Sequence, residues 1–188
     1  MEAFFNKMGK LGGGLLGVGF LFTRFIFVVD GGERGVLFDK FRGVQDTVYG
    51  EGMHFRIPIV QEPKIFEVRC KYSLIPTKTG TRDMQTVDIA LRILHRPVED
   101  KLPIILNKIG MDYDKRILPS IGQEVLKSVV AQYNAEQLLT QREKVSQEIR
   151  ADLAKRADEF NLILEDVAIT DLKFSPEFAS SIEQKQVA

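Results

Sequence analysis

The sequence predicts an α+β domain behind an apolar N-terminal segment. Between residues 30 and 97, short apolar runs are divided by Gly and Pro, which is typical of strands. After Pro97 the apolar residues recur every three or four positions, as in amphipathic helices, and residues 162–174 then alternate again. Strands followed by helices and one returning strand indicate the α+β class.

The first segment, residues 11–29, contains nineteen residues and a single charge, Arg24. As an α-helix it is about 28 Å long, close to the roughly 30 Å hydrocarbon core of a bilayer. We therefore predict a membrane anchor over residues 1–29, followed by a domain over residues 30–174. The apolar side chains of this predicted anchor are Leu11, Leu15, Leu16, Val18, Phe20, Leu21, Phe22, Phe25, Ile26, Phe27, Val28 and Val29.

Two other interpretations of this segment were weighed. Lys7 and Lys10 precede the apolar run as in a signal peptide, but cleavage requires small residues after the run. Ala3 is the only alanine in residues 1–89, so an uncleaved anchor is favoured. Arg24 and five glycines dilute the hydrophobicity, which leaves both a full span and a shallow interfacial helix open.

Glycines in this segment follow two patterns. Gly9, Gly13 and Gly17 recur every four residues, a spacing that lets two membrane helices pack closely, although glycine is also simply common in such helices. Gly12, Gly14 and Gly17 fit the G-x-G-x-x-G pattern of dinucleotide sites. That pattern requires a preceding strand, which is missing here, so no nucleotide site is predicted.

Within the domain, short strands are expected at residues 35–38, 47–49 and 54–57, and a longer strand at 64–75 before a loop at 76–82. The next strand, residues 84–96, alternates strictly. Alternation over this length is typical of a half-buried strand. The residues predicted to face the core are Val87, Ile89, Leu91 and Ile93.

The helical part begins with a short helix that Gly110 closes. An amphipathic helix over residues 117–133 is expected next, with Pro119 in its first turn, and Asn134 caps a short helix. Thr140 and Glu143 fit a capping box that opens a helix to about residue 160. Its predicted buried stripe is Val145, Ile149, Leu153, Ala157 and Phe160.

After the strand at 162–174, Ser175 and Pro176 are expected to open a further helix over residues 175–188. The pattern of this helix is still running at Ala188, without a C-cap. We therefore expect the natural protein to continue.

Composition excludes several function classes. The chain has 26 basic and 26 acidic residues, so it lacks the basic excess typical of nucleic-acid binding. Cys70 is the only cysteine, which rules out an intrachain disulfide. Cys70, His54 and His95 are the only candidates for nucleophilic catalysis and carry no local catalytic signature. No zinc, calcium or phosphate-binding motif occurs, so we predict no catalytic, metal or cofactor site and a protein that is not an enzyme.

Several blocks of the sequence resemble the prohibitins, members of the SPFH (band 7) family. The similarity runs from about residue 29 to residue 188, and the block at 35–46 is more similar to the first of the two prohibitin paralogues than to the second. The blocks are residues 35–46 (GVLFDKFRGVQD), 50–58 (GEGMHFRIP), 91–97 (LRILHRP), 112–120 (DYDKRILPS), 125–131 (VLKSVVA) and 140–143 (TQRE).

The resemblance implies an SPFH domain with a curved, mainly antiparallel sheet packed by helices, and no catalytic residues. It also implies a subunit anchored in the mitochondrial inner membrane, with its domain in the intermembrane space. Such subunits co-assemble with the second paralogue, through a C-terminal coiled coil, into large rings. The partners implied are membrane lipids including cardiolipin, the m-AAA protease and respiratory complexes, in a scaffold that modulates protein quality control.

This sequence departs from the family pattern where the coiled coil should follow, because the chain stops as that helix begins. Two other functions also fit the sequence. One is an SPFH organiser of another membrane, as in the stomatin-like proteins. The other is a membrane-tethered cysteine hydrolase that uses Cys70 with His54 or His95.

Overall fold

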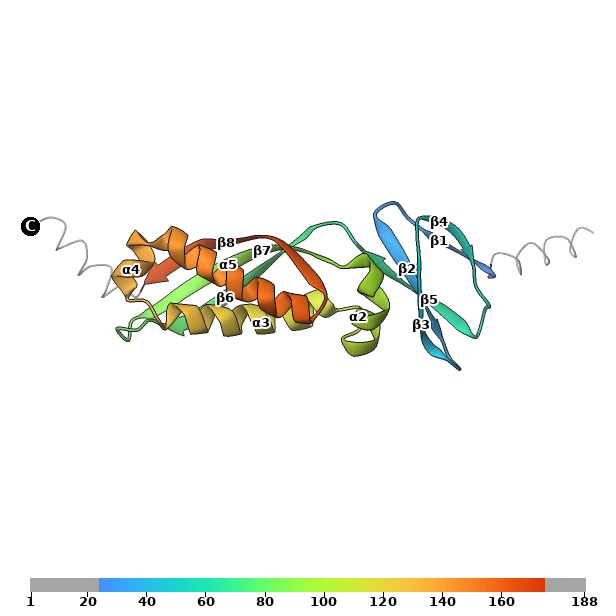
Figure 1. Cartoon of the computed structure of the whole chain (residues 1–188), viewed down its shortest axis with the longest axis horizontal. Coiled ribbons are helices and arrows are strands. Elements are labelled where there is room, and N and C mark those ends of the chain that lie inside the picture. The colour runs from blue at the N-terminus through green and yellow to red at the C-terminus, as the bar shows by residue number, and fades with distance from the viewer. Residues whose placement is uncertain (1–23, 175–188) are drawn as a thin grey trace, which may run out of the picture.

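The computed structural model describes residues 24–174, which form an elongated molecule with a β lobe and a helical lobe (Figure 1). The β lobe holds β1 (Ile26–Val29), β2 (Glu33–Asp39), β3 (Gly43–Tyr49), β4 (Gly52–Phe55) and β5 (Gln61–Glu67). The helical lobe holds β6 (Lys71–Gly80), β7 (Thr86–Pro97), α3 (Tyr113–Val130), α4 (Ala135–Thr140), α5 (Arg142–Glu159) and β8 (Leu162–Phe174). Between the lobes lie η1 (Glu99–Lys101) and α2 (Leu102–Lys108).

The β lobe consists of a two-stranded ribbon, β1–β4, and a three-stranded sheet in the order β3-β2-β5, all antiparallel. Phe27, Val29 and Leu37 form a small core between the ribbon and the sheet. Gly35 makes this packing possible, because a Cβ there would lie 3.1 Å from both Phe27 and Val29. The ribbon is therefore packed across β2 as part of the domain.

The helical lobe is an antiparallel sheet, β6-β7-β8, with α3 and α5 packed on one face. The helices approach the sheet closely at Gly122, where a Cβ would lie 2.6 Å from Ile75 Cδ1. The alternating residues of β7 and the stripe of α5 meet in one continuous core. Val36, Phe66 and Val68 of the β lobe belong to the same core, so the lobes share buried apolar surface.

The sheet edge at β8 is covered by side chains of α5. An edge strand exposes backbone groups that no neighbouring strand satisfies. Arg142 Nη2 donates a hydrogen bond to the carbonyl oxygen of Ile169 at 2.5 Å, and Arg150 Nη2 donates to that of Glu165 at 2.9 Å. Two carbonyls of the edge strand are thereby occupied within the domain.

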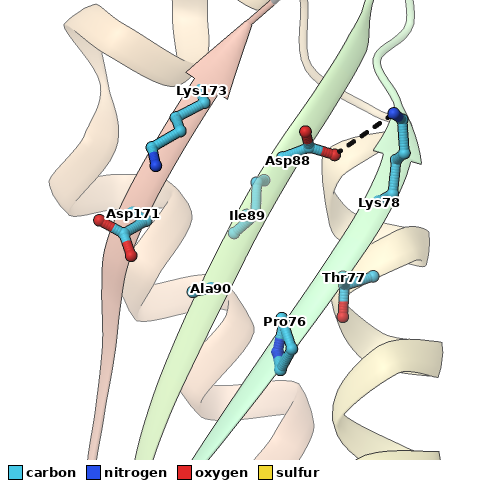
Figure 2. A pocket seen from close by; sticks show the side chains of 8 residues that line it. All are labelled: Pro76, Thr77, Lys78, Asp88, Ile89, Ala90, Asp171 and Lys173. Atoms are coloured by element: carbon cyan, nitrogen blue, oxygen red, sulfur yellow. Dashed lines mark ion pairs between the residues drawn. The ribbon is translucent and has the colours of Figure 1, made fainter.

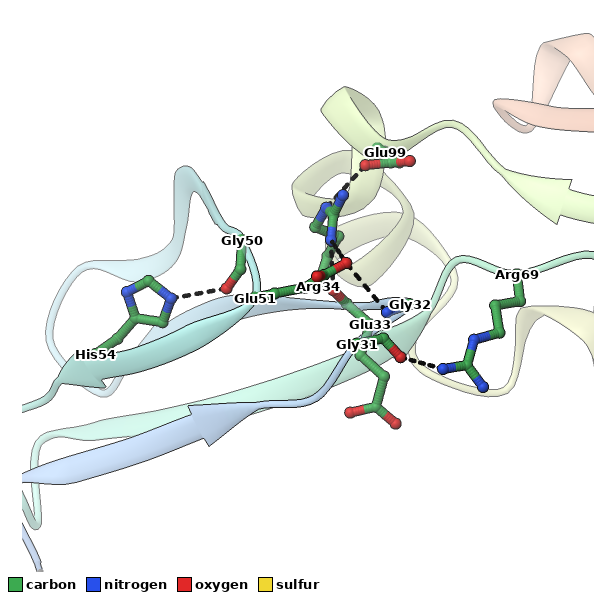
Figure 3. Close-up of polar contacts among 9 residues, drawn as sticks. All are labelled: Gly31, Gly32, Glu33, Arg34, Gly50, Glu51, His54, Arg69 and Glu99. Carbon is green, nitrogen blue, oxygen red and sulfur yellow. Dashed lines mark hydrogen bonds and ion pairs between the residues drawn. The ribbon is translucent and has the colours of Figure 1, made fainter.

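Arg34 joins the two lobes through polar contacts (Figure 3). Its Nε donates to Glu99 Oε2 of η1 at 2.8 Å, and its Nη1 donates to Glu51 Oε1 at 3.2 Å. Glu51 also accepts a hydrogen bond from the Gly32 N–H at 3.1 Å, and this bond, with Arg34 next, lowers the pKa of Glu51. One guanidinium thus links β2, the β3–β4 turn and η1, which lies between the lobes.

The predicted anchor boundary is wrong for Ile26, Phe27, Val28 and Val29, which form β1 rather than the end of a helix. They pair with β4, and Phe27 and Val29 are buried in the β lobe. A β-branched and aromatic run suits a strand as well as an apolar helix, and β4 supplies the partner. The domain therefore includes residues 26–29. Residues 11–23 of the predicted anchor, Gly9, and the predicted helix at 175–188 lie outside the described residues.

Three smaller predictions are also corrected. The strand predicted at residues 64–75 is two strands, β5 and β6, and the predicted loop at 76–82 largely belongs to β6. Helix α3 begins at Tyr113, so Pro119 lies inside it rather than in its first turn. The capping box is formed by Asn134 and Gln137 at α4, whereas the Thr140 hydroxyl donates to the carbonyl of Glu136.

The remaining core predictions are confirmed. Val87, Ile89, Leu91 and Ile93 are buried on β7. On α5 the stripe from Val145 to Ala157 is buried, while Phe160 is only partly buried. Across residues 24–174, no helix combines the length and the apolar character needed to cross a bilayer.

We expect Val129→Asp or Ile93→Asp to unfold the domain, because both side chains are fully buried. An unpaired carboxylate in this core should lower the free energy of unfolding by more than about 4 kcal/mol. Gln123→Asp, on the exposed face of α3, is the matched control and should change it little. Thermal unfolding followed by circular dichroism measures the difference; a wild-type melting temperature for Val129→Asp would contradict the assigned face.

Candidate functional site

The β1–β4 ribbon presents an apolar face to solvent. Strand geometry places alternate residues on opposite faces, so burying Phe27 and Val29 turns Ile26 and Val28 outward. Their partners in β4 are Phe55 and Met53. Val28 is 56%, Met53 74% and Phe55 78% exposed. Four apolar side chains therefore form one outer face of the ribbon.

The turn between β4 and β5 extends this apolar surface. Ile59 is 87% exposed and has a φ of 77°, a left-handed conformation that β-branched residues rarely adopt. The turn is closed by two hydrogen bonds: Ile57 N–H donates to Gln61 Oε1, and Gln61 N–H donates to the Ile57 carbonyl. Backbone strain at an exposed apolar residue in a closed turn indicates a functional role.

A second apolar residue lies in the neighbouring β2–β3 turn, where Phe41 is 85% exposed. The Asp39 carboxylate shapes this turn by accepting hydrogen bonds from the N–H groups of Phe41 and Arg42, which lowers the pKa of Asp39. Lys40 N–H donates to the carbonyl of Val60, which joins the two turns. Both turns are thus held beside each other by backbone contacts.

Strands β1 and β4 and the turns that carry these residues lie toward the end of the molecule where β1 begins, away from the end of β8 (Figure 1). We call the set the apolar end: Phe25, Val28, Phe41, Met53, Phe55, Ile57 and Ile59. Large contiguous apolar surface on a domain marks contact with a protein or a membrane. In the sequence, Lys40 and Arg42 flank Phe41, and Arg56 lies between Phe55 and Ile57.

The structure separates the residues that sequence reasoning weighed for catalysis. Cys70 is exposed between β5 and β6. His95 is fully buried on β7, where its Nε2 lies 3.0 Å from Ser73 Oγ and its ring meets Tyr113 edge-on. His54 lies in β4, with its Nε2 2.7 Å from the Gly50 carbonyl oxygen, and packs beside Phe27 and Tyr49. Among the described residues, neither histidine is hydrogen-bonded to Cys70.

Burial lowers the pKa of His95, while the nearby Asp114 carboxylate raises it and Lys71 lowers it further. The unfolded chain therefore binds a proton below about pH 6.5 that the folded domain does not, and stability falls as the pH drops through that value.

Between pH 7.5 and 5.5, His95→Leu should lose less of its free energy of unfolding than wild type, by up to about 1.4 kcal/mol. Urea unfolding at each pH measures this, with His54→Gln as the control; equal losses in wild type and His95→Leu would contradict it.

A trough on the outer face of the β6-β7-β8 sheet contains no nucleophilic Cys or Ser and no His. It has a volume of about 390 Å³ and lies on the face opposite the helices (Figure 2). Its charged groups are Lys78 and Asp88, paired at 3.8 Å, with Asp171 and Lys173. Within residues 24–174, no group of three or more His, Cys, Asp or Glu residues is placed to hold a metal ion.

The apolar end was missed by sequence reasoning, although one signal for it was present. In residues 53–59, apolar Met53, Phe55, Ile57 and Ile59 alternate with His54, Arg56 and Pro58. Alternation predicts a strand with one apolar face, which is usually turned to the core. Here the opposite face carries His54 toward the core, and the apolar side chains point outward.

The described residues form an α+β domain with an exposed apolar end. A family model described as SPFH domain / Band 7 family matches residues 27–188. Prohibitin 1 of Gallus gallus is 53% identical over 98% of this chain and 68% of its own length. Prohibitin-3, mitochondrial, of Arabidopsis thaliana is 50% identical over 99% of this chain and 67% of its own, and Prohibitin 1 of Drosophila melanogaster 49% over 98% and 67%. The chain therefore belongs to the SPFH/Band 7 family and, within it, to the prohibitins.

Proposed function

We propose that this protein is a non-enzymatic scaffold subunit of the mitochondrial inner membrane that assembles into ring-shaped prohibitin complexes. The observation that carries the proposal is the apolar end, at the end of the domain where the described chain begins. Family membership supports a membrane scaffold of the prohibitin type. Two similar proteins from Arabidopsis thaliana are named as mitochondrial, which supports the compartment.

The proposed attachment has two parts. The apolar segment before β1 anchors the chain, and the apolar end of the domain lies in the interface of the same leaflet. Full burial of a large apolar side chain contributes about 1.5–3 kcal/mol, so several exposed ones add substantially to an anchor. Because both contacts lie at one end, the long axis of the domain points away from the bilayer and the end of β8 lies farthest from it.

Assembly is proposed to use the other end. Residues 175–188 follow β8 directly and are expected to open the helix that leads to a coiled coil with the second paralogue. A ring of such subunits, facing the intermembrane space, would enclose a patch of membrane and organise its lipids, including cardiolipin. The m-AAA protease and respiratory complexes are the proposed protein partners, through which the scaffold modulates quality control.

The competing functions differ in what they require. A stomatin-like organiser of another membrane would use the same apolar end, and imaging of the tagged protein separates it from the leading proposal. Exclusive mitochondrial location rules it out. A cysteine hydrolase is disfavoured, because Cys70 is exposed whereas the His95 ring is fully buried and bound to Ser73.

Contact of the apolar end with lipid is testable with single tryptophans, because the chain has none. In the full chain reconstituted into phosphatidylcholine vesicles, brominated acyl chains should quench Met53→Trp strongly. Tyr72→Trp is the control, because Tyr72 is equally exposed but lies on the helical lobe. Its fluorescence should be unaffected, and equal quenching at both sites, or none at position 53, would contradict the proposed orientation.

Assembly is tested by expressing the full-length protein with and without the second prohibitin paralogue. Together they should migrate as one large complex in a native gel of mild detergent extracts, and electron microscopy should show rings. A full-length protein that stays monomeric in the presence of the paralogue, and that carbonate releases from membranes, would overturn the scaffold proposal.

A further inference from the structure

We propose that a hollow between the two lobes, beside the start of α3, is a docking site for an arginine side chain of a partner protein. Its acceptors are the carboxylates of Glu33 and Asp112 and the hydroxyl of Tyr113. The inference goes beyond the proposed membrane scaffold and does not depend on the apolar end. It follows from acceptors without partners that the fold brings together from both lobes.

The hollow has a volume of about 340 Å³ and lies between strands of the β lobe and the first turn of α3. Its charged lining consists of four carboxylates, on Glu33, Glu67, Asp112 and Asp114, and two lysines, Lys71 and Lys115. Four negative charges against two positive ones leave an excess of two negative charges, on a chain whose formal net charge is zero. The hollow therefore favours a cationic ligand.

Glu33 is the acceptor that the β lobe supplies. It lies directly opposite Glu67 in the antiparallel pairing of β2 with β5. Like charges in directly opposite positions of two strands destabilise the pairing. Lys71 Nζ lies 2.7 Å from Glu67 Oε2, which relieves Glu67. The Glu33 carboxylate is turned away from Arg34 and has no hydrogen-bond or ion-pair partner within residues 24–174, so a cation beside it would relieve the repulsion (Figure 3).

Tyr113, the first residue of α3, supplies a second acceptor. Its side chain is only 4% exposed, and its hydroxyl makes no hydrogen bond to any other described residue. Burial raises the pKa of this hydroxyl, and the charges of Asp114 and Glu67 raise it further. Both carboxylates line the hollow, so the hydroxyl is directed toward it. Because buried polar groups are nearly always hydrogen-bonded, a buried hydroxyl without a partner points to a ligand.

Asp112 is the third acceptor and occupies the N-cap position of α3. An aspartate at this position usually accepts a hydrogen bond from a backbone N–H group of the first turn. Here the side chain makes no such bond, and the residue is exposed. Its carboxylate is therefore available to a ligand from the helical lobe, whereas that of Glu33 comes from the β lobe.

A guanidinium group fits these acceptors better than other cations do. Among the described residues, no three His, Cys, Asp or Glu side chains are placed to hold one metal ion, which disfavours a bare divalent cation. Guanidinium presents five N–H donors in one plane and can bond several acceptors at once, whereas ammonium is a point charge. Ile65 and Met111 also line the hollow and provide apolar surface for the methylene stem of an arginine.

The arginine belongs to a protein segment rather than to the free amino acid. Free arginine carries an α-carboxylate, which the excess of negative charge in the lining would repel. In a peptide that charge is replaced by a neutral amide. Bound between Glu33 and Asp112, the side chain would bridge the two lobes and hold their relative position.

The test uses the full chain in detergent micelles and a peptide of four alanines around one central arginine, blocked at both ends and carrying an uncharged dye. Fluorescence anisotropy at about 0.15 M salt, where attraction between exposed charges is screened, measures the dissociation constant. A hydrogen bond to a charged group contributes about tenfold or more to binding, so Glu33→Gln and Tyr113→Phe should each raise the dissociation constant about tenfold. Asp112→Asn, at an exposed residue, repeats the test where loss of folding cannot interfere. Glu143→Gln, an exposed change of equal charge on α5, is the matched control and should leave it unchanged.

The outcomes distinguish this site from other forms of binding. A peptide with citrulline in place of arginine keeps the shape without the charge and should not bind. Equal binding of the two peptides, binding of neither, or equal weakening by Glu33→Gln and Glu143→Gln overturns the site. Free arginine should compete poorly; if it competes as well as the peptide, the ligand is a small organic cation and the assignment to a protein segment is wrong. Peptide binding that falls as the concentration of the chain rises would show that a second copy fills the hollow, which contradicts a different partner.

Discussion

The pairing of β1 with β4 is the constraint on which the apolar end of this domain depends. Four residues that would suit the end of an apolar helix instead form a strand, because Gly52–Phe55 gives them a partner. Once Phe27 and Val29 enter the small core, the two-residue period of the strand leaves Ile26 and Val28 on the outside. The same pairing directs Met53 and Phe55 outward. Burial of one face of the ribbon therefore exposes the apolar side chains of its other face.

Sequence patterns predicted the helical lobe well and the β lobe less well, for physical reasons. Strand β7 and the stripe of α5 are long and strictly periodic, since each buries a single face against one core. A short strand has too few residues for its alternation to show where the strand begins and ends. The sequence therefore predicted one strand where the structure has β5 and β6. The cap predicted for the short helix at Asn134 is present at α4, whereas Thr140 ends α4 and its hydroxyl donates to the Glu136 carbonyl instead of capping α5.

The apolar end could not be predicted from the sequence, because its contacts join distant residues. Its parts come from β1, the β2–β3 turn, β4 and the β4–β5 turn, and each looks unremarkable alone. The Arg34–Glu99 hydrogen bond, which connects β2 to η1, could not be predicted either, because the two residues are 65 positions apart in the sequence. The contact of the two turns through Lys40 and Val60 and the left-handed backbone at Ile59 could not be predicted, because both depend on the folded chain.

The arginines on the edge of β8 have a consequence for the proposed attachment of this domain to a membrane surface. Confinement to two dimensions raises the encounter rate of identical domains, and an open strand edge is a template for growth of a sheet from one molecule into the next. Arg142 and Arg150 occupy the carbonyls of Ile169 and Glu165, which such growth would need. Pairing of neighbouring copies through this strand edge is thereby disfavoured, which would leave the proposed ring assembly to side-chain surfaces.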